Sequence, residues 1–184
     1  MTFLYFAYGS NMLSSRLYAR CPSAKMICAA RVERYALDFS KKSLDGSAKA
    51  NLVEQSFSVQ TPGVLFEINI EDRHTLDMFE GAGKEYDRID DFRINVEGQT
   101  ISATTYLATA RHDDLVPFDW YLALVLAGAI EHRLGDEHIA RICATGHQPD
   151  PVTGRTSRIA ALDALVHHGH DDYMRLLGRA SSLA

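Results

Sequence analysis

The stretch FLYFAYGSNM, residues 3–12, carries the clearest structural signal in the chain. Residues 3–7 form an unbroken apolar and aromatic run, which is typical of a buried central strand. The run passes directly into Tyr8-Gly9-Ser10-Asn11, and a polar, helix-like stretch follows as far as Cys21-Pro22. Because Asn is a residue type that caps helices, we expect Asn11 to start a short helix that ends near Arg20.

The turn between this strand and this helix has two interpretations. It is either an ordinary strand end before a capped helix, or a pocket for an anion. The first backbone N–H groups of a helix have no partners inside the helix and lie at the positive end of its dipole. Gly9 permits close approach of a ligand to the backbone, while Ser10 and Asn11 add side-chain donors. A carboxylate or a phosphate would fit such a turn.

Outward from the turn, the pattern predicts strands first and helices late. The expected strands are residues 26–39 (long or broken), 50–59, 63–70, 86–96 and 101–108. The expected helices are residues 71–79, 118–134, 137–143, 158–167 and 171–177. Asp45-Gly46 and Glu97-Gly98 are turn signals, and Thr61-Pro62 is expected to separate two strands. We therefore predict a single α/β domain over residues 1–184, with a helical tail from about residue 156.

Composition narrows the class of protein. The 184 residues are 46% hydrophobic, with a formal net charge of −5. A nucleic-acid-binding surface normally carries a basic excess, so we expect no nucleic-acid partner. No apolar run of 18 residues and no basic signal sequence is found, so we expect no membrane association. The three cysteines form no C-x-x-C pair, which favours the reducing cytoplasm.

A second feature is the stretch DMFEGAGKEYDR, residues 77–88. Glu80 follows an apolar helix end and precedes the flexible Gly81-Ala82-Gly83. An acid at a helix C-terminus lies at the unfavourable end of the helix dipole. It is either a solvated residue before a glycine cap or a carboxylate that faces an apolar pocket, with a raised pKa suited to proton transfer.

Together, YFAYGSNM, the later Glu-Gly and the tyrosine a few residues beyond it resemble the γ-glutamylcyclotransferases. The order of further segments agrees, including CPSAKMICAARVERYALDF, GVLFEI, ATTYLAT and PFDWYLALVLAGA. The resemblance covers residues 3 to about 144, and more loosely 146–159. Met12 stands where the family commonly has Leu, and the resemblance does not extend to the tail from Arg158. The resemblance implies an α/β (α+β) fold, with a mixed, partly closed, barrel-like sheet flanked by helices.

The resemblance implies a reaction in which the turn at residues 8–12 and Glu80 both have a role. In that family the substrate's own α-amine attacks the γ-carbonyl of a glutamyl amide, and 5-oxoproline and an amine or amino acid are released. Glu80 matches the catalytic glutamate. The residues that match the substrate-binding turn and the aromatic pocket lining are Tyr8, Gly9, Ser10, Asn11, Met12, Tyr86 and Tyr121. Because Tyr121 sits in an apolar helix, a purely structural role is equally consistent with the sequence. A tyrosine hydroxyl is expected to position Glu80 or to polarise the carbonyl.

Such a reaction needs no metal and no cofactor, and the expected partner is a small γ-glutamyl substrate. The cluster HHGH, residues 167–170, is better explained by a helix C-terminus than by a metal site. Members of the family are often dimeric, so the resemblance also admits a homodimer. Two alternatives stay open: an enzyme that acts on γ-glutamyl amines instead of γ-glutamyl amino acids, and a non-catalytic protein that binds a γ-glutamyl or other small carboxylate ligand. We expect the segments 40–49 and 109–117 to build the leaving-group side of the pocket.

Overall fold

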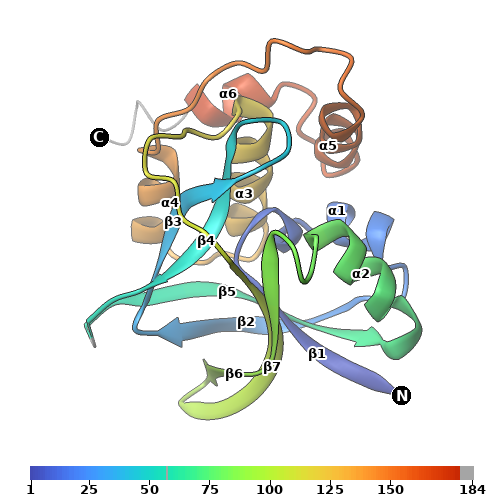
Figure 1. Ribbon diagram of the computed structural model, residues 1–184, viewed down its shortest axis with the longest axis vertical. Helices are drawn as coiled ribbons and strands as arrows, with labels where there is room; N and C mark the ends of the chain where they lie inside the picture. The colour runs from blue at the N-terminus through green and yellow to red at the C-terminus, as the bar shows by residue number, and fades with distance from the viewer. Residues whose placement is uncertain (57, 179–184) are drawn as a thin grey trace.

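The computed structural model describes residues 1–56 and 58–178 and contains a closed five-stranded barrel (Figure 1). The strands lie in the order β1-β5-β2-β6-β7. Their bounds are Thr2–Ala7 (β1), Lys25–Glu33 (β2), Gln60–Asn69 (β5), Tyr86–Val96 (β6) and Gln99–Ala108 (β7). The α/β class is confirmed, and the predicted partly closed sheet is a closed one because β1 meets β7 in parallel at Tyr5 and Thr104.

The opening strand has the central position that its apolar run predicts. It pairs with β5 along its whole length, from Thr2 opposite Asn69 to Ala7 opposite Val64. Phe6 is fully buried, and Ala7 and Tyr8 are nearly so. A strand buried on both sides leaves no room for polar side chains, so the turn after Ala7 is the first place where the chain presents them.

The predicted strand 26–39 is divided between two sheets. Arg34 has a left-handed backbone, with φ of 67°, and β2 ends immediately before it. The chain then continues as β3 (Tyr35–Lys42), which pairs with β4 (Ala48–Glu54) in a separate two-stranded hairpin. This hairpin rises from the barrel toward the helices (Figure 1).

The expected break at Thr61-Pro62 is wrong, because both residues lie inside β5. Pro62 is opposite Arg31 of β2, whereas pairing with β1 extends no further than Val64. Among the described strands, none pairs with Pro62 on that side, so no N–H donor is needed there. A proline is tolerated at such an edge position. The predicted strand 50–59 is shorter than expected, since β4 ends at Glu54, and residue 57 lies outside the described residues.

Helices cover one end of the barrel (Figure 1). They are η1 (Ser10–Met12), α1 (Ser14–Arg20), η2 (Ile70–Asp72), α2 (Arg73–Glu80), α3 (Asp119–Glu131), α4 (Asp136–Cys143), α5 (Thr156–His167) and α6 (Tyr173–Gly178). Helix α3 is apolar on all faces because η1, α4, α5 and α6 all contact it. Gly128 lets the turn approach closely, since a Cβ there would lie 2.7 Å from the Cβ of Met12.

Among the described residues, no helix is both long and apolar enough to cross a membrane. The elements that the sequence singles out converge at the helical end of the barrel. The end of β1, the η1 turn and the end of α2 are brought together there by the pairing of β1 with β5, from which α2 continues through η2.

Candidate active site

Glu80 is the last residue of α2, and its local sequence explains where it sits. Gly81 follows with φ of 66°, the left-handed conformation that ends many helices and that glycine adopts without a steric penalty. Leu76 anchors the helix in the core and is fully buried, whereas Phe79 is 53% exposed and is not a core residue. The Glu80 side chain is 17% exposed. The helix therefore presents its terminal carboxylate inward, toward the opening turn.

Asn11 connects the opening turn to Glu80. Its Nδ2 donates to Oε1 of Glu80 at 2.6 Å and lies 3.1 Å from the hydroxyl of Tyr5. Its Oδ1 accepts a hydrogen bond from Arg20 at 2.8 Å. The prediction that Asn11 caps the first helix is wrong: η1 and α1 have no side-chain cap, and the chain breaks between them at Leu13. The Asn11 amide instead holds the carboxylate.

The electrostatic environment of Glu80 favours proton transfer. Burial raises the pKa of its carboxyl above the usual value. The positive charges of Arg20, Arg16 and Lys41 and the Asn11 hydrogen bond act in the opposite direction without cancelling the effect of burial. A carboxylate of raised basicity can take a proton from an amine and return it to a departing nitrogen.

The turn itself is buried by the residues around it. Ser10 and Asn11 are 8% and 3% exposed. The reason is that Glu80, Tyr86 and Tyr121 close over the turn from three different elements. The Met12 N–H donates to the carbonyl of Gly9 at 3.0 Å, so this N–H is used within the turn. Met12 is fully buried against α3 and does not line a cavity with the other predicted residues.

Three predicted tyrosines surround the turn, and their hydroxyl groups are all occupied by the backbone. Tyr8 donates to the carbonyl of Tyr106, and Tyr86 donates to the carbonyl of Ala50 at 2.7 Å. Tyr121 accepts a hydrogen bond from the Ala50 N–H at 3.0 Å. In the described structure none of these hydroxyl groups makes a hydrogen bond to Glu80, so the expected positioning of Glu80 by a tyrosine is not found. Tyr86 and Tyr121 thereby hold β4 against the turn, whereas Tyr8 is bonded to β7.

Sequence reasoning missed Tyr5, Tyr106, Arg16 and Arg20, which complete the surroundings of Glu80. The Tyr5 hydroxyl accepts a hydrogen bond from the Asn11 amide, and the ring of Tyr106 packs edge-on against that of Tyr5. Arg16 and Arg20 lie four residues apart on α1 and therefore share one helix face. The spacing of these two arginines, directly after the polar turn, could have identified Arg16 and Arg20 from the sequence.

Two adjoining cavities meet at Glu80. The smaller has a volume of about 30 Å³ and is enclosed by the turn and five tyrosines. The larger, of about 520 Å³, extends between the end of α2, the β3–β4 hairpin and the start of α5. The residues common to both are Ser10, Glu80, Tyr86 and Tyr121. Glu80 thus stands between a narrow, tyrosine-lined space and a wide one.

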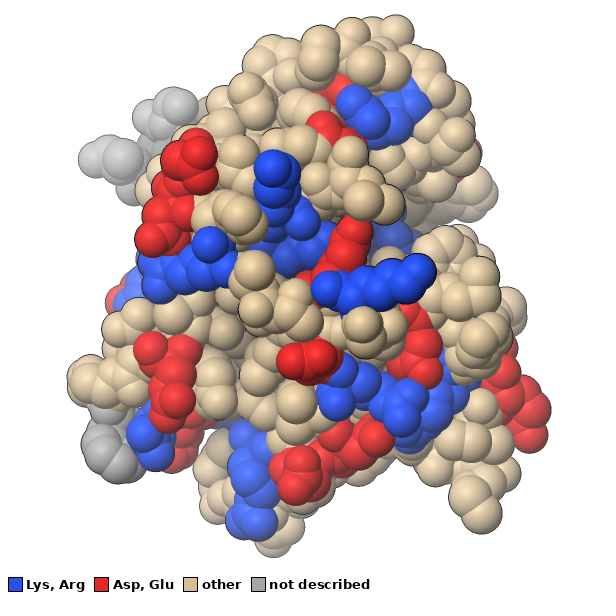
Figure 2. Space-filling model, in the orientation of Figure 1, with Lys and Arg blue, Asp and Glu red and all other residues tan. Residues whose placement is uncertain are grey.

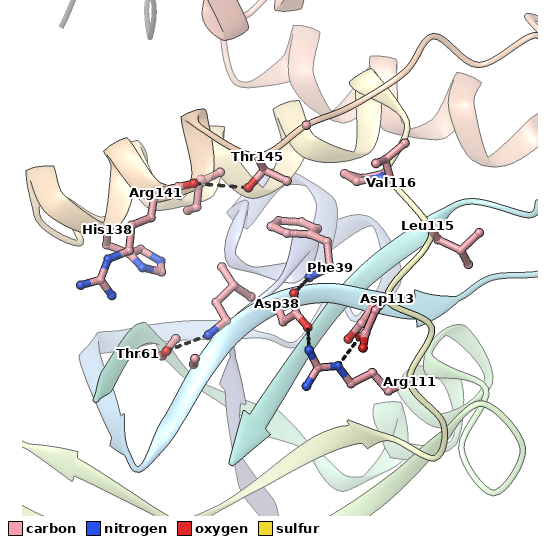
Figure 3. Close-up of a pocket in the computed structure, with 16 residues that line it drawn as sticks. Asp38, Phe39, Thr61, Arg111, Asp113, Leu115, Val116, His138, Arg141 and Thr145 are labelled. Atoms are coloured by element: carbon pink, nitrogen blue, oxygen red, sulfur yellow. Dashed lines mark hydrogen bonds and ion pairs between the residues drawn. The ribbon is translucent and has the colours of Figure 1, made fainter. Parts of the chain in front are cut away.

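Of the two segments expected to build the leaving-group side, one lines the larger cavity and the other does not. Lys41, Asp45 and Lys49, in the segment 40–49, line the larger cavity. Most of the segment 109–117 lines a separate cavity of about 410 Å³, where Arg111 joins Asp38 and Asp113 opposite His138 of α4 (Figure 3). Its first residues, Thr109 and Ala110, border Lys41 from outside the larger cavity.

The histidine cluster near the C-terminus packs against a neighbouring helix end. His168 Nε2 lies 3.5 Å from Glu131, and the ring of His168 lies against that of His170. Among residues 1–56 and 58–178, no group of three or more His, Cys, Asp or Glu side chains is arranged to hold a metal ion.

Comparisons with known proteins agree with this geometry. The family model described as gamma-glutamyl cyclotransferase, AIG2-like, matches residues 5–123. The human and mouse proteins named gamma-glutamylcyclotransferase are each 31% identical to this chain over 161 residues, which is 85% of this chain and 84% of theirs. A solved structure named gamma-glutamyl cyclotransferase is 28% identical, with a TM-score of 0.76 over 89% of this chain and 98% of that one. The chain therefore belongs to the AIG2-like gamma-glutamyl cyclotransferase family of enzymes.

Proposed function

We propose that this enzyme cyclises γ-glutamyl amides, releasing 5-oxoproline and an amine or amino acid, with Glu80 as the proton carrier. The observation that carries the proposal is the placement of Glu80. It is a largely buried carboxylate of raised pKa, it accepts a hydrogen bond from Asn11 of the opening turn, and it stands where the two cavities meet.

The proposed reaction is balanced without water or any co-reactant. The neutral α-amine of the substrate forms a bond to the γ-carbonyl carbon and gives a proton to the Glu80 carboxylate. The amide C–N bond then breaks as Glu80 returns that proton to the departing nitrogen. Since the nucleophile belongs to the substrate, the protein's contribution is to fold the glutamyl chain toward ring closure and to move one proton.

We assign the glutamyl group, which becomes the ring, to the narrow, tyrosine-lined space together with the adjoining part of the larger cavity next to Ser10 and Glu80. We assign the glutamyl α-carboxylate to the N–H groups of Gly9, Ser10 and Asn11, since that of Met12 is used within the turn. Tyr86 and Tyr121 hold Ala50 over this space. The leaving group then extends past Glu80 into the larger cavity.

The experiment is direct detection of 5-oxoproline after incubation of the purified protein with a panel of γ-glutamyl amino acids and γ-glutamyl amines. We expect 5-oxoproline in amounts equal to the released amine. Binding of these compounds without 5-oxoproline would identify a non-catalytic binding protein. Release of free glutamate would show that water, and not the α-amine, is the nucleophile.

A further inference from the structure

Arg16 differs from every other basic residue that lines the larger cavity. Four of these residues have partners: Arg20 donates to Asn11, Lys41 pairs with Glu85, Lys49 with Asp45, and Arg155 with Asp150. Arg16 is 7% exposed, and its Nε has no hydrogen-bond partner among the described residues. No ion pair within the described ranges includes it. Among the described residues that line this cavity, it is the one cation buried without a counter-ion.

An unpaired buried guanidinium is costly, and this cost points to a ligand. Burial and the neighbouring charge of Arg20 lower the pKa of Arg16 to about 9, so the group still carries its charge at neutral pH. A charge held away from water is destabilising unless an opposite charge is bound to it. A carboxylate matches the planar fork of an arginine and would supply that charge.

The rim of the same cavity carries apolar side chains that are open to solvent. Leu44 at the tip of the β3–β4 hairpin is 96% exposed, and Met78 and Phe79 on α2 are 69% and 53% exposed. Large apolar residues exposed together beside a cavity mark a surface that binds an apolar group. Between the barrel and the helices, Figure 2 shows basic and acidic side chains crossing the face of the molecule, with uncharged residues among them.

We propose that the larger cavity is the leaving-group subsite, in which Arg16 binds the α-carboxylate of a departing amino acid and Leu44, Met78 and Phe79 contact its bulky apolar side chain. The proposal rests on the cyclisation proposed above. It assigns as preferred substrates the γ-glutamyl derivatives of amino acids such as leucine, methionine and phenylalanine. γ-Glutamyl amines and γ-glutamyl derivatives of small amino acids are disfavoured.

The position of Arg16 fits a role on the leaving-group side. It lines the larger cavity but not the tyrosine-lined one that we assign to the glutamyl group. Its charge also acts on Glu80, which places it near the departing nitrogen. The α-carboxylate of the departing amino acid is attached to the carbon next to that nitrogen. It therefore lies near Arg16 once the glutamyl group is bound.

The test for the carboxylate compares γ-glutamyl-leucine with γ-glutamyl-3-methylbutylamide, which lacks only the leaving-group carboxylate. We expect the parent enzyme to favour the leucine compound by roughly ten- to a hundredfold in kcat/KM, the scale of a charged hydrogen-bonded pair. Arg16→Met should abolish most of this preference, chiefly through KM, and Arg16→Lys should restore part of it. Any effect of Arg16 on Glu80 is common to both substrates and cancels in their ratio.

The matched control is Arg93→Met on the exposed face of β6, which should leave the preference unchanged. An equal loss on both substrates in Arg16→Met would place the Arg16 ligand elsewhere and overturn the proposal. If Arg16→Met does not fold, Arg16→Lys provides the test. An unaltered preference for γ-glutamyl-leucine in Arg16→Lys would contradict a site in which the arginine binds the carboxylate through two hydrogen bonds. Absence of 5-oxoproline from every substrate would refute the proposed function itself, whereas 5-oxoproline formed from both compounds at equal rates refutes only this subsite.

The test for the apolar rim compares γ-glutamyl-leucine with γ-glutamyl-alanine. We expect a preference for leucine of about tenfold, consistent with partial burial of three carbons. The double variant Leu44→Ser, Met78→Ser should bring the preference close to one. Met174→Ser on α6, a methionine that is 52% exposed and lies outside the cavity, is the control and should retain the preference. Loss of preference in the control, or its persistence in the double variant, would contradict a role for the rim.

Discussion

Glu80 and Glu131 occupy comparable places in the molecule but have opposite properties. Each is the last residue of its helix, α2 or α3, and each contacts the segment that follows β1. Their side chains are 17% and 19% exposed. The pKa of Glu80 is raised, whereas that of Glu131 is lowered to about 2. Exposure therefore does not account for the difference.

The number and kind of hydrogen-bond donors account for it. Burial acts to raise the pKa of both groups. At Glu131 this is outweighed by His132 and by the backbone N–H of Ser14, which donates at 2.9 Å. At Glu80 a single amide, that of Asn11, donates, and the neighbouring arginine charges do not overcome burial. One carboxylate is fixed in its charged form, and the other retains the capacity to exchange a proton.

Replacement of each carboxylate by its amide gives the largest expected contrast. Glu80→Gln keeps the shape and removes the proton carrier, so turnover should fall at least roughly a hundredfold, with the fold retained. Glu131→Gln should leave turnover within a few-fold of the parent. The measurement is the initial rate of 5-oxoproline formation at saturating substrate. A Glu80→Gln enzyme that turns over nearly as fast as the parent would remove Glu80 from the mechanism.

The next largest effect is expected in the turn that faces Glu80. A Cβ on Gly9 would lie 3.0 Å from the Cβ of Ala50 and 3.5 Å from the hydroxyl of Tyr121. The branched side chain of Gly9→Val would fill the space of the ligand, and we expect more than a tenfold rise in KM. Ser10→Ala should change KM by no more than about one hydrogen bond, because the main chain is the donor. Similar effects for the two variants would show that the turn is only a strand end.

A third prediction concerns the stability that Glu131 provides. Its pKa of about 2 in the folded protein is below the ordinary value of 4.5. Its contribution is therefore present above about pH 4.5 and is lost as the pH falls toward 2. Glu131→Gln should lower the free energy of unfolding by roughly 2 to 3 kcal/mol at pH 7 and by less at pH 3. Urea unfolding at both pH values measures this, and an equal loss at both would contradict the assigned role of the charge.

The smallest expected effect is a shift in pH dependence. Glu80 must be ionised to accept a proton, so kcat/KM should fall as the pH drops through its raised pKa. Arg20 is the charge that lowers this pKa most. Arg20→Met should move the acid limb of the profile to higher pH, while Arg93→Met should leave it in place. If the acid limb of the kcat/KM profile of Arg20→Met stays in place or moves to lower pH, a group other than Glu80 is responsible for it.

Local pattern alone predicted the elements that have a continuous apolar run or a clear turn signal. The apolar run of β1, the hairpin of β6 and β7 around Glu97-Gly98, and the long apolar helix α3 all occur close to the expected bounds. The break at Pro62 was wrong, because whether a proline disrupts a strand depends on where the neighbouring strand ends. The separation of β2 from β3 at Arg34 likewise depends on which sheet each strand joins.

Residue types and spacings were enough to predict the strand and turn at residues 3–12, the family resemblance, and Glu80 as the candidate catalytic residue. Those follow from residue types and spacings, which are local properties of the chain. The packing of distant segments was needed to show that Asn11 holds Glu80 instead of capping a helix, and that Arg16 is buried without a partner among the described residues. It also decided that Glu80, and not Glu131, has the raised pKa. A carboxylate's pKa depends on the donors and charges within a few ångströms, and those come from segments up to 117 residues apart in sequence.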